Sequence, residues 1–110
     1  VAHVGLTETQ ARARGYDVRI GRFPLKANGK AIAQGATDGF VKIVLSSATG
    51  ELLGAHMIGE GVTEMIQGPG LAMTLETTEA ELLQTVFAHP TQSEALHEAV
   101  LSAYDRALHI

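Results

Sequence analysis

The pattern in this chain most able to do chemistry is a histidine directly before a proline, with a glutamate five residues after the histidine. His89, Pro90 and Glu94 lie in the segment AHPTQSEALHEA, residues 88–99. Pro90 favours extended backbone at His89, and the helix that follows can bring Glu94 to one ring nitrogen. A carboxylate there fixes the tautomer and raises the basicity of the imidazole, while the other nitrogen exchanges a proton near neutral pH. The pattern predicts a His–Glu acid–base pair that lacks its own nucleophile.

The same segment also fits a purely structural interpretation. Thr91 and Glu94 have the Thr-x-x-Glu spacing of a capping box, in which Thr91 is the N-cap, Glu94 is the N3 residue and Pro90 is an apolar neighbour before the cap. This interpretation accounts for Thr91 and Glu94 but not for His89. The residues alone leave both interpretations open.

Two other motifs fail at one residue each. GEGVTE, residues 59–64, resembles a dinucleotide fingerprint, but Glu64 occupies the third glycine position and its carboxylate would repel a pyrophosphate. HEAVL, residues 97–101, begins like a zinc-protease motif, but Leu101 stands where the second histidine must be. The five histidines share no ligand spacing. We therefore expect neither nucleotide binding by this segment nor a metal site.

Composition and charge narrow the class of protein. A chain of 110 residues with 45% hydrophobic residues suits one domain, residues 1–110, and its apolar runs are too short to span a membrane. The absence of cysteine excludes disulfide and thiol chemistry by this chain alone. Residues 1–35 hold six basic and two acidic residues, and residues 36–110 hold two basic and ten acidic ones. Without a basic stripe interleaved with aromatic residues, nucleic-acid binding is disfavoured. The acidic part suits either a basic protein partner or a plain solvated surface.

The elements that must position the His–Glu pair follow from periodicity and breakers. Strands precede helices, which predicts an α+β domain with an antiparallel sheet and helices packed on one side. Thr7 and Gln10 form a capping box, Gly15 ends the first helix, and Gly50 closes a hairpin. A buried helix is expected over 62–76, with Val62, Met65, Ile66, Leu71, Ala72 and Leu75 inward and a kink at Gly68-Pro69-Gly70. The remaining expected elements are a short strand at the start of the chain, in AHVG, a helix at 8–14, strands at 16–24 and in 40–59, a helix at 78–87 capped by Thr78, and a last helix at 92–108.

Three segments, in order, resemble a known family: VGLTE at 4–8, GELLGAHMIGEGVTEMIQ at 50–67, and AHPTQSEALHEA. Together they are similar to the C-terminal interface (dimerisation) domain of the pyridine nucleotide–disulfide oxidoreductases, and most like that of the dihydrolipoamide dehydrogenases. The similarity spans essentially the whole chain, and HPTxSE is specific to the catalytic pair of that family. It implies the interface-domain fold of the flavin disulfide reductases, in a fragment of a longer enzyme that lacks the FAD and NAD domains.

The resemblance also implies roles for particular residues. His89 would be the acid–base group that exchanges protons with the dithiol, Glu94 would orient it, and His89 and Pro90 would lie beside the FAD of the partner subunit. Pro90 would follow a cis peptide bond. The helix break at 68–70 departs from the family pattern.

The implied activity is NAD-dependent oxidation of dihydrolipoamide through FAD and the redox disulfide of the partner subunit. The isolated fragment would bind no cofactor and be inactive. The implied partners are a second copy, in a homodimer, and the acyltransferase subunit-binding domain of a 2-oxo acid dehydrogenase complex, with no nucleic acid and no membrane. The implied location is the bacterial cytoplasm or the mitochondrial matrix. The alternative is a non-catalytic α+β dimerisation or docking module, in which TQSE is only a helix cap.

Overall fold

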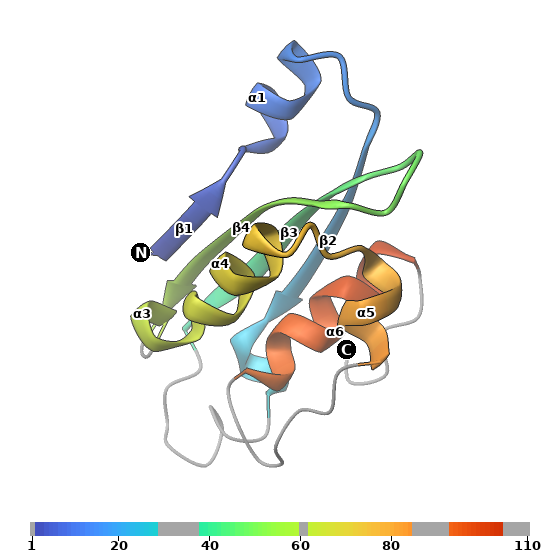
Figure 1. Ribbon diagram of the computed structural model, residues 1–110. Coiled ribbons are helices and arrows are strands. Elements are labelled where there is room, and N and C mark those ends of the chain that lie inside the picture. The colour runs from blue at the N-terminus through green and yellow to red at the C-terminus, as the bar shows by residue number, and fades with distance from the viewer. Residues whose placement is uncertain (1, 29–37, 60–61, 85–92, 105–110) are drawn as a thin grey trace.

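Four antiparallel strands form one sheet in the order β1-β4-β3-β2 (Figure 1). The computed structural model describes residues 2–28, 38–59, 62–84 and 93–104. The central pair is the predicted hairpin, and Gly50 in its loop has a φ of 78°, a backbone conformation that favours glycine. Pro24 ends a strand at the sheet edge, where its missing N–H costs no ladder bond. The strands are β1 (Ala2–Gly5), β2 (Val18–Pro24), β3 (Gly39–Ser46) and β4 (Leu52–Gly59).

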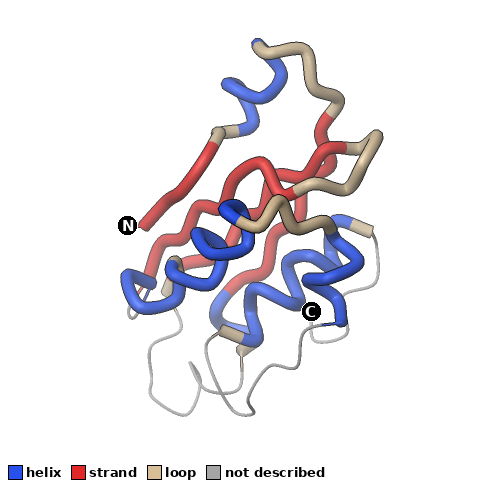
Figure 2. Tube along the Cα trace, viewed as in Figure 1, coloured by secondary structure: helices blue, strands red, loops and turns tan. Residues whose placement is uncertain are grey.

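The helices of the second part of the chain lie together on one face of the sheet (Figure 2). They are α3 (Val62–Met65), α4 (Gln67–Thr74), α5 (Glu79–Gln84) and α6 (Glu94–Ala103). Earlier in the chain come α1 (Glu8–Ala13) and a 3₁₀ turn, η1 (Leu25–Ala27). The predicted α+β class with an antiparallel sheet is therefore confirmed. In the described part of the chain, no helix is both long enough and apolar enough to span a bilayer.

The main core lies between the sheet and these helices. Alternate residues of the central strands point into it, as the two-residue period of a strand requires. Small residues of α6 meet the sheet, and larger side chains fill the space toward α3 and α5. The buried members of this core include Phe23, Leu25, Val41, Ile43, Leu45, Leu52, Ala55, Met57, Val62, Met65, Leu82, Leu96, Ala99 and Val100.

The first helix packs on the opposite face of the sheet. Ala11 is fully buried there against Val44 and Leu53 in a second, smaller core. The predicted capping box is present: Gln10 N–H donates to the Thr7 hydroxyl at 3.1 Å, and Thr7 N–H donates to Gln10 Oε1 at 3.0 Å. Gly15, with a φ of 88°, ends the helix as expected. The expectation that helices lie on one side therefore holds for α3–α6, while α1 covers the other side.

The helix predicted over 62–76 is two helices, and their boundary falls at Ile66. Pro69 lacks the N–H that would bond to the carbonyl four residues earlier, at Met65, and its ring crowds that carbonyl. Gly68, Pro69 and Gly70 are themselves helical, inside the first turn of α4. The predicted interruption is confirmed, but the break lies before the Gly-Pro-Gly segment and not within it.

The expectation that Leu71 and Leu75 are buried is wrong. Their side chains are 59% and 68% exposed, although Val62 and Met65 are buried as predicted. The break at Ile66 separates α4 from α3, and the core-facing side of α4 is formed by Pro69, Ala72 and Met73. Helical spacing identified an apolar face correctly but could not show that this chain leaves it uncovered.

Both of the last two predicted helices are present among the described residues, with differences at their ends. Thr78 precedes α5, and its hydroxyl donates to Glu81 Oε2 at 2.7 Å, which holds the pKa of Glu81 below its ordinary value. The last helix ends at Ala103, before the predicted end at Leu108, because Tyr104 leaves helical geometry with φ −114° and ψ 20°. The predicted end of the previous helix, at 85–87, lies outside the described residues.

Candidate functional site at the start of the last helix

Glu94, one member of the predicted acid–base pair, is the first residue of α6 and is half-buried. The two residues after it, Ala95 and Leu96, are buried in the main core. His89, Pro90 and Thr91 lie outside the described residues, so the predicted His–Glu contact and the predicted Thr91 cap remain predictions. Ser93 has helical backbone, with φ −62° and ψ −21°, and its side chain makes no capping hydrogen bond.

The position of Glu94 depends on how α6 is held against β2. Gly21 of β2 has no side chain, and a Cβ added there would meet the backbone carbonyl oxygen of Ala99. Ala99 is fully buried, as an alanine must be where helix and strand come this close. The pair of small residues thus sets the distance between α6 and the sheet. Any change in that distance moves Glu94 with the helix.

The other end of α6 is fastened by Arg19 of β2. Its guanidinium donates to the carbonyl oxygen of Ala103 at 3.1 Å and lies 4.5 Å from the ring centroid of Tyr104. A cation at a helix C-terminus satisfies a carbonyl that has no helical partner and interacts favourably with the helix dipole. Two contacts with β2, at Gly21 and Arg19, therefore fix both the distance of α6 from the sheet and the direction of its axis.

Glu98 is a buried carboxyl group that sequence reasoning did not single out. It lies on α6 one turn after Glu94, and only 6% of it is exposed. Carboxyl groups are rarely buried so deeply unless they are paired. The i, i+4 spacing from Glu94 is the signal that could have identified it, because residues at this spacing share one face of a helix.

The described histidines do not form a metal site. His56 Nε2 lies 2.9 Å from the carbonyl oxygen of Leu6, and His97 Nε2 lies 3.2 Å from that of Leu83. Because a carbonyl oxygen only accepts, each of these nitrogens donates its proton. Within the residues placed by the structure, no three His, Cys, Asp or Glu side chains gather as metal ligands.

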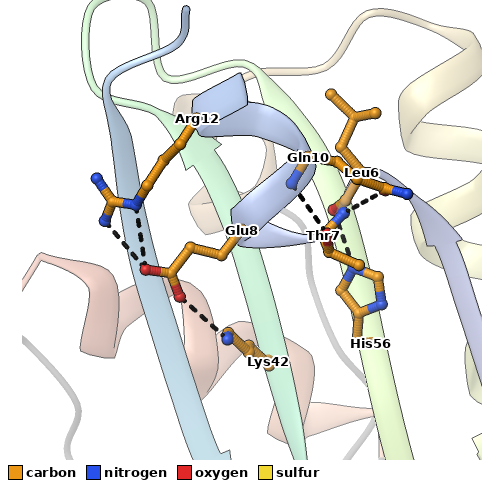
Figure 3. A network of polar contacts seen from close by, with 7 residues as sticks. All are labelled: Leu6, Thr7, Glu8, Gln10, Arg12, Lys42 and His56. Carbon is orange, nitrogen blue, oxygen red and sulfur yellow. Dashed lines mark hydrogen bonds and ion pairs between the residues drawn. The ribbon is translucent and has the colours of Figure 1, made fainter. Parts of the chain in front are cut away.

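The VGLTE segment is tied to the sheet through Glu8. Its carboxylate accepts from Arg12 at 3.0 Å and from Lys42 of β3 at 3.2 Å, as Figure 3 shows. Two hydrogen bonds hold the pKa of Glu8 below its ordinary value. The one from Arg12 has the larger effect, and the one from Lys42 has the next largest. The His56–Leu6 contact lies beside this network, so two strands hold the start of α1.

We expect substitution of Arg12 by glutamine to raise the pKa of Glu8, as followed by the NMR shift of its carboxyl carbon during an acid titration. Lys42→Gln should raise it less, because the Arg12 hydrogen bond has the larger effect. Since folding lowers this pKa, the stabilisation is present above the unfolded-state pKa and is lost as pH falls through the folded one. Arg14→Gln is the matched control, because its equal charge change lies away from Glu8; an equal effect of Arg14→Gln would contradict the assignment.

Comparisons with known proteins identify the same family over nearly the whole chain. Residues 1–100 match the family model described as the pyridine nucleotide-disulphide oxidoreductase, dimerisation domain. A dihydrolipoyl dehydrogenase of Zymomonas mobilis is 69% identical over 109 residues, which are 99% of this chain and 23% of that protein. One from Rhizobium etli is 60% identical over 108 residues, which are 98% of this chain and 22% of that protein.

A solved structure shows the same architecture. The HOCl-induced flavoprotein disulfide reductase of Escherichia coli matches with a TM-score of 0.84 and 31% identity, over 89% of this chain and 22% of that one. The chain therefore spans less than a quarter of the length of these relatives.

Proposed function

Because the chain belongs to the dimerisation-domain family of the pyridine nucleotide-disulphide oxidoreductases, we propose that it is that domain of a dihydrolipoamide dehydrogenase. In this proposal a longer protein oxidises dihydrolipoamide with NAD, through FAD and a redox disulfide. The observation that carries it is the 69% identity with a dihydrolipoyl dehydrogenase over 99% of this chain. The proposed cellular location, by the same reasoning, is the bacterial cytoplasm or the mitochondrial matrix.

The proposed contribution of this chain to the reaction is a proton carrier. His89 would accept a proton from a thiol of dihydrolipoamide, so that a thiolate attacks the disulfide, and would later protonate the leaving thiolate. Glu94 would hold one ring nitrogen and stabilise the imidazolium that forms after the first transfer. The geometry that supports this role is the fixed position of Glu94, at the start of a helix held by Gly21 and Arg19.

The short helix α3 does not fit the pyrophosphate of FAD or NAD. Glu64 is exposed in the single turn of α3, where a phosphate-binding helix would present backbone N–H groups and no carboxylate. We therefore assign both dinucleotides to the part of the longer protein outside this chain. His89 and Pro90 would contact only the flavin of the partner subunit, and no step of the proton transfer is assigned to the flavin.

We also propose two macromolecular partners. The first is a second copy of the chain, in accordance with the family description. The second is the basic subunit-binding domain of an acyltransferase. Exposed carboxylates on the described helices support it, because Glu64 and Glu81 lie on α3 and α5 and few basic residues are found in this half of the chain.

The activity is tested by assaying the longer protein for NAD reduction by dihydrolipoamide, beside the 110-residue chain alone. We expect turnover by the longer protein and none by the chain, because the chain has no cysteine to form a redox disulfide. Glutathione disulfide with NADPH serves as the competing substrate pair. A longer protein that turns over this pair, and leaves dihydrolipoamide unreacted, would place the chain in another branch of the family.

A further inference from the structure

The face of the sheet that carries α1 is only partly covered by that helix. The helix packs over Val44 and Leu53, near the loop between β3 and β4. Side chains two residues apart on a strand share a face, so Phe40 and Lys42 lie on the same face as Val44. Phe40 is half-buried and belongs to neither of the two described cores. The part of this face toward the start of β3 is therefore left uncovered by α1.

A row of basic side chains crosses this face from one edge of the sheet to the other. This basic row consists of Arg22, Lys42, His56 and His3, which are paired in register across the four strands. Figure 3 shows Lys42 and His56 on the side of the sheet where α1 lies. The rings of His3 and His56 stack, with their centroids 6.0 Å apart. Because neighbouring strands are about 4.8 Å apart, the basic row is about 14 Å long.

An apolar row lies beside the basic row, two residues further along each strand. It consists of Pro24, Phe40 and Ile58, which are also paired in register. Ile58 is 44% exposed and, like Phe40, belongs to neither of the described cores. Single exposed apolar side chains are ordinary on a protein surface, but three in register form a continuous strip that suits a partner.

Arg22 is the cation of the basic row that is most available to a partner. Its guanidinium lies 4.1 Å from the ring centroid of Phe40, which holds it against the apolar row. No carboxylate of the described residues lies within ion-pair distance of Arg22. Lys42 instead shares the carboxylate of Glu8 with Arg12, so these three side chains together keep a net positive charge. The face therefore presents positive charge directly beside an apolar strip.

The helices on the other side of the sheet have the reverse charge. As described, α3, α4, α5 and α6 include no lysine or arginine. Their charged side chains are Glu64, Glu79, Glu81, Glu94 and Glu98. An acidic partner is thus attracted to the α1 side of the sheet and repelled from the helix side, whereas the basic partner proposed above has the opposite preference.

The two rows together favour a protein helix over other anions. A nucleic acid binds through phosphates and stacked bases, but the ring of Phe40 is already covered by Arg22, and the rings of His3 and His56 stack on each other. An extended strand cannot use both rows, because its alternate side chains point to opposite sides. An amphipathic helix can, because its apolar residues form one stripe and acidic residues can border that stripe.

We propose that this face docks an acidic amphipathic helix of another protein. The helix lies across the strands, with its apolar stripe on the apolar row and its carboxylates over the basic row. Arg22 makes the main ionic contact and Ile58 the main apolar one. The inference does not depend on the proposed activity, because it uses the face of the sheet opposite α6.

The test is binding of a fluorescent synthetic peptide to the longer protein, followed by fluorescence anisotropy. The peptide has about 18 residues, enough to form an isolated helix, with a stripe of leucines bordered by glutamates. We expect Arg22→Glu to raise the dissociation constant at least about 10-fold, because an attraction becomes a repulsion. Lys26→Glu is the matched control, since it reverses the charge of an exposed residue in η1, beyond the end of β2. It should change the dissociation constant less than about 2-fold.

Two further variants test the apolar contact and the role of charge. Ile58→Asp should weaken peptide binding about as much as Arg22→Glu, and Ile58→Leu should bind like the wild type. Glu8→Gln removes the carboxylate that Lys42 shares with Arg12, so it should bind the peptide about 3-fold more tightly. A damaged fold would not produce tighter binding, and circular dichroism melts would show that every variant is folded.

The outcomes distinguish the proposed partner from other occupants of this face. Equal binding of a scrambled peptide of the same composition would overturn the proposal, and so would tighter binding of single-stranded RNA or of anionic lipid vesicles that Arg22→Glu abolishes. Absence of peptide binding would also overturn it. A lower melting temperature of Arg22→Glu than of Lys26→Glu would then show that another part of the longer protein covers this face. Weaker peptide binding by Arg22→Glu with unchanged dihydrolipoamide turnover supports the inference.

Discussion

Substitution of His89 by glutamine in the longer enzyme is expected to lower the rate of dihydrolipoamide oxidation at least about 100-fold. A positioned general acid–base group typically contributes 10²- to 10⁴-fold, and glutamine keeps similar size and hydrogen bonding but cannot carry the proton. Steady-state NADH formation, with flavin content and dimer state measured beside it, gives the comparison. His3→Gln is the matched control, because it makes the same chemical change at an exposed residue of β1 and should leave the rate near that of the wild type.

Glu94 should act through His89, and the pH profile distinguishes that role from a helix cap. Glu94→Gln removes a carboxylate that favours the imidazolium form of His89. The limb of the pH–rate profile that is assigned to His89 should therefore shift to lower pH. If Glu94 were only a helix cap, its loss would change the melting temperature and leave that limb of the pH–rate profile in place.

Survival of turnover in His89→Gln would favour the non-catalytic module, in which TQSE only begins a helix.

The sheet and the order of the elements could be predicted because their signals are local. Gly50 between two apolar runs, and Thr7 three residues before Gln10, each determine the conformation of a few neighbouring residues whatever the rest of the chain does. These features appear in the structure as expected. The break near Pro69 was predictable for the same reason, since it follows from one missing N–H.

Features that depend on what lies opposite a residue were not predictable. The spacing of Leu71 and Leu75 shows that they share an apolar face, but spacing is the same whether the core of this chain or a second chain covers that face. Glu98 was missed because a glutamate at a helical position is ordinarily solvated. The His89–Glu94 pair likewise depends on a contact across a turn, and its prediction rested on the family resemblance as much as on the residues.

Gly21 is the residue whose importance is clearest only in the folded structure. A glycine within a strand pattern indicates a bulge or a close approach by another segment, but the sequence does not say which segment approaches. In the fold the approaching segment is α6, at the backbone of Ala99. The strand glycine and the helix start at Glu94 are therefore parts of one arrangement, although 73 positions separate them in the chain.

Gly21→Ala should consequently destabilise the domain by about 3 kcal/mol, the upper end of the usual range for overpacking. The added methyl group meets a backbone carbonyl oxygen of α6, and unlike the end of a flexible side chain this atom can move only with its helix. The melting temperature should fall by roughly 10–20 °C, as followed by circular dichroism. Gly70→Ala is the control, because a methyl group there enters open space in a helix and should leave the melting temperature unchanged or slightly higher.

The same substitution connects stability with catalysis. If α6 moves away from β2 to accommodate the methyl group, Glu94 moves with it, and the longer enzyme carrying Gly21→Ala should lose turnover at temperatures where it is still folded. Gly70→Ala should retain turnover under the same conditions. An unchanged melting temperature in Gly21→Ala would mean that α6 does not approach β2 as closely as the fold requires, and that the contact at Gly21 does not determine the position of Glu94.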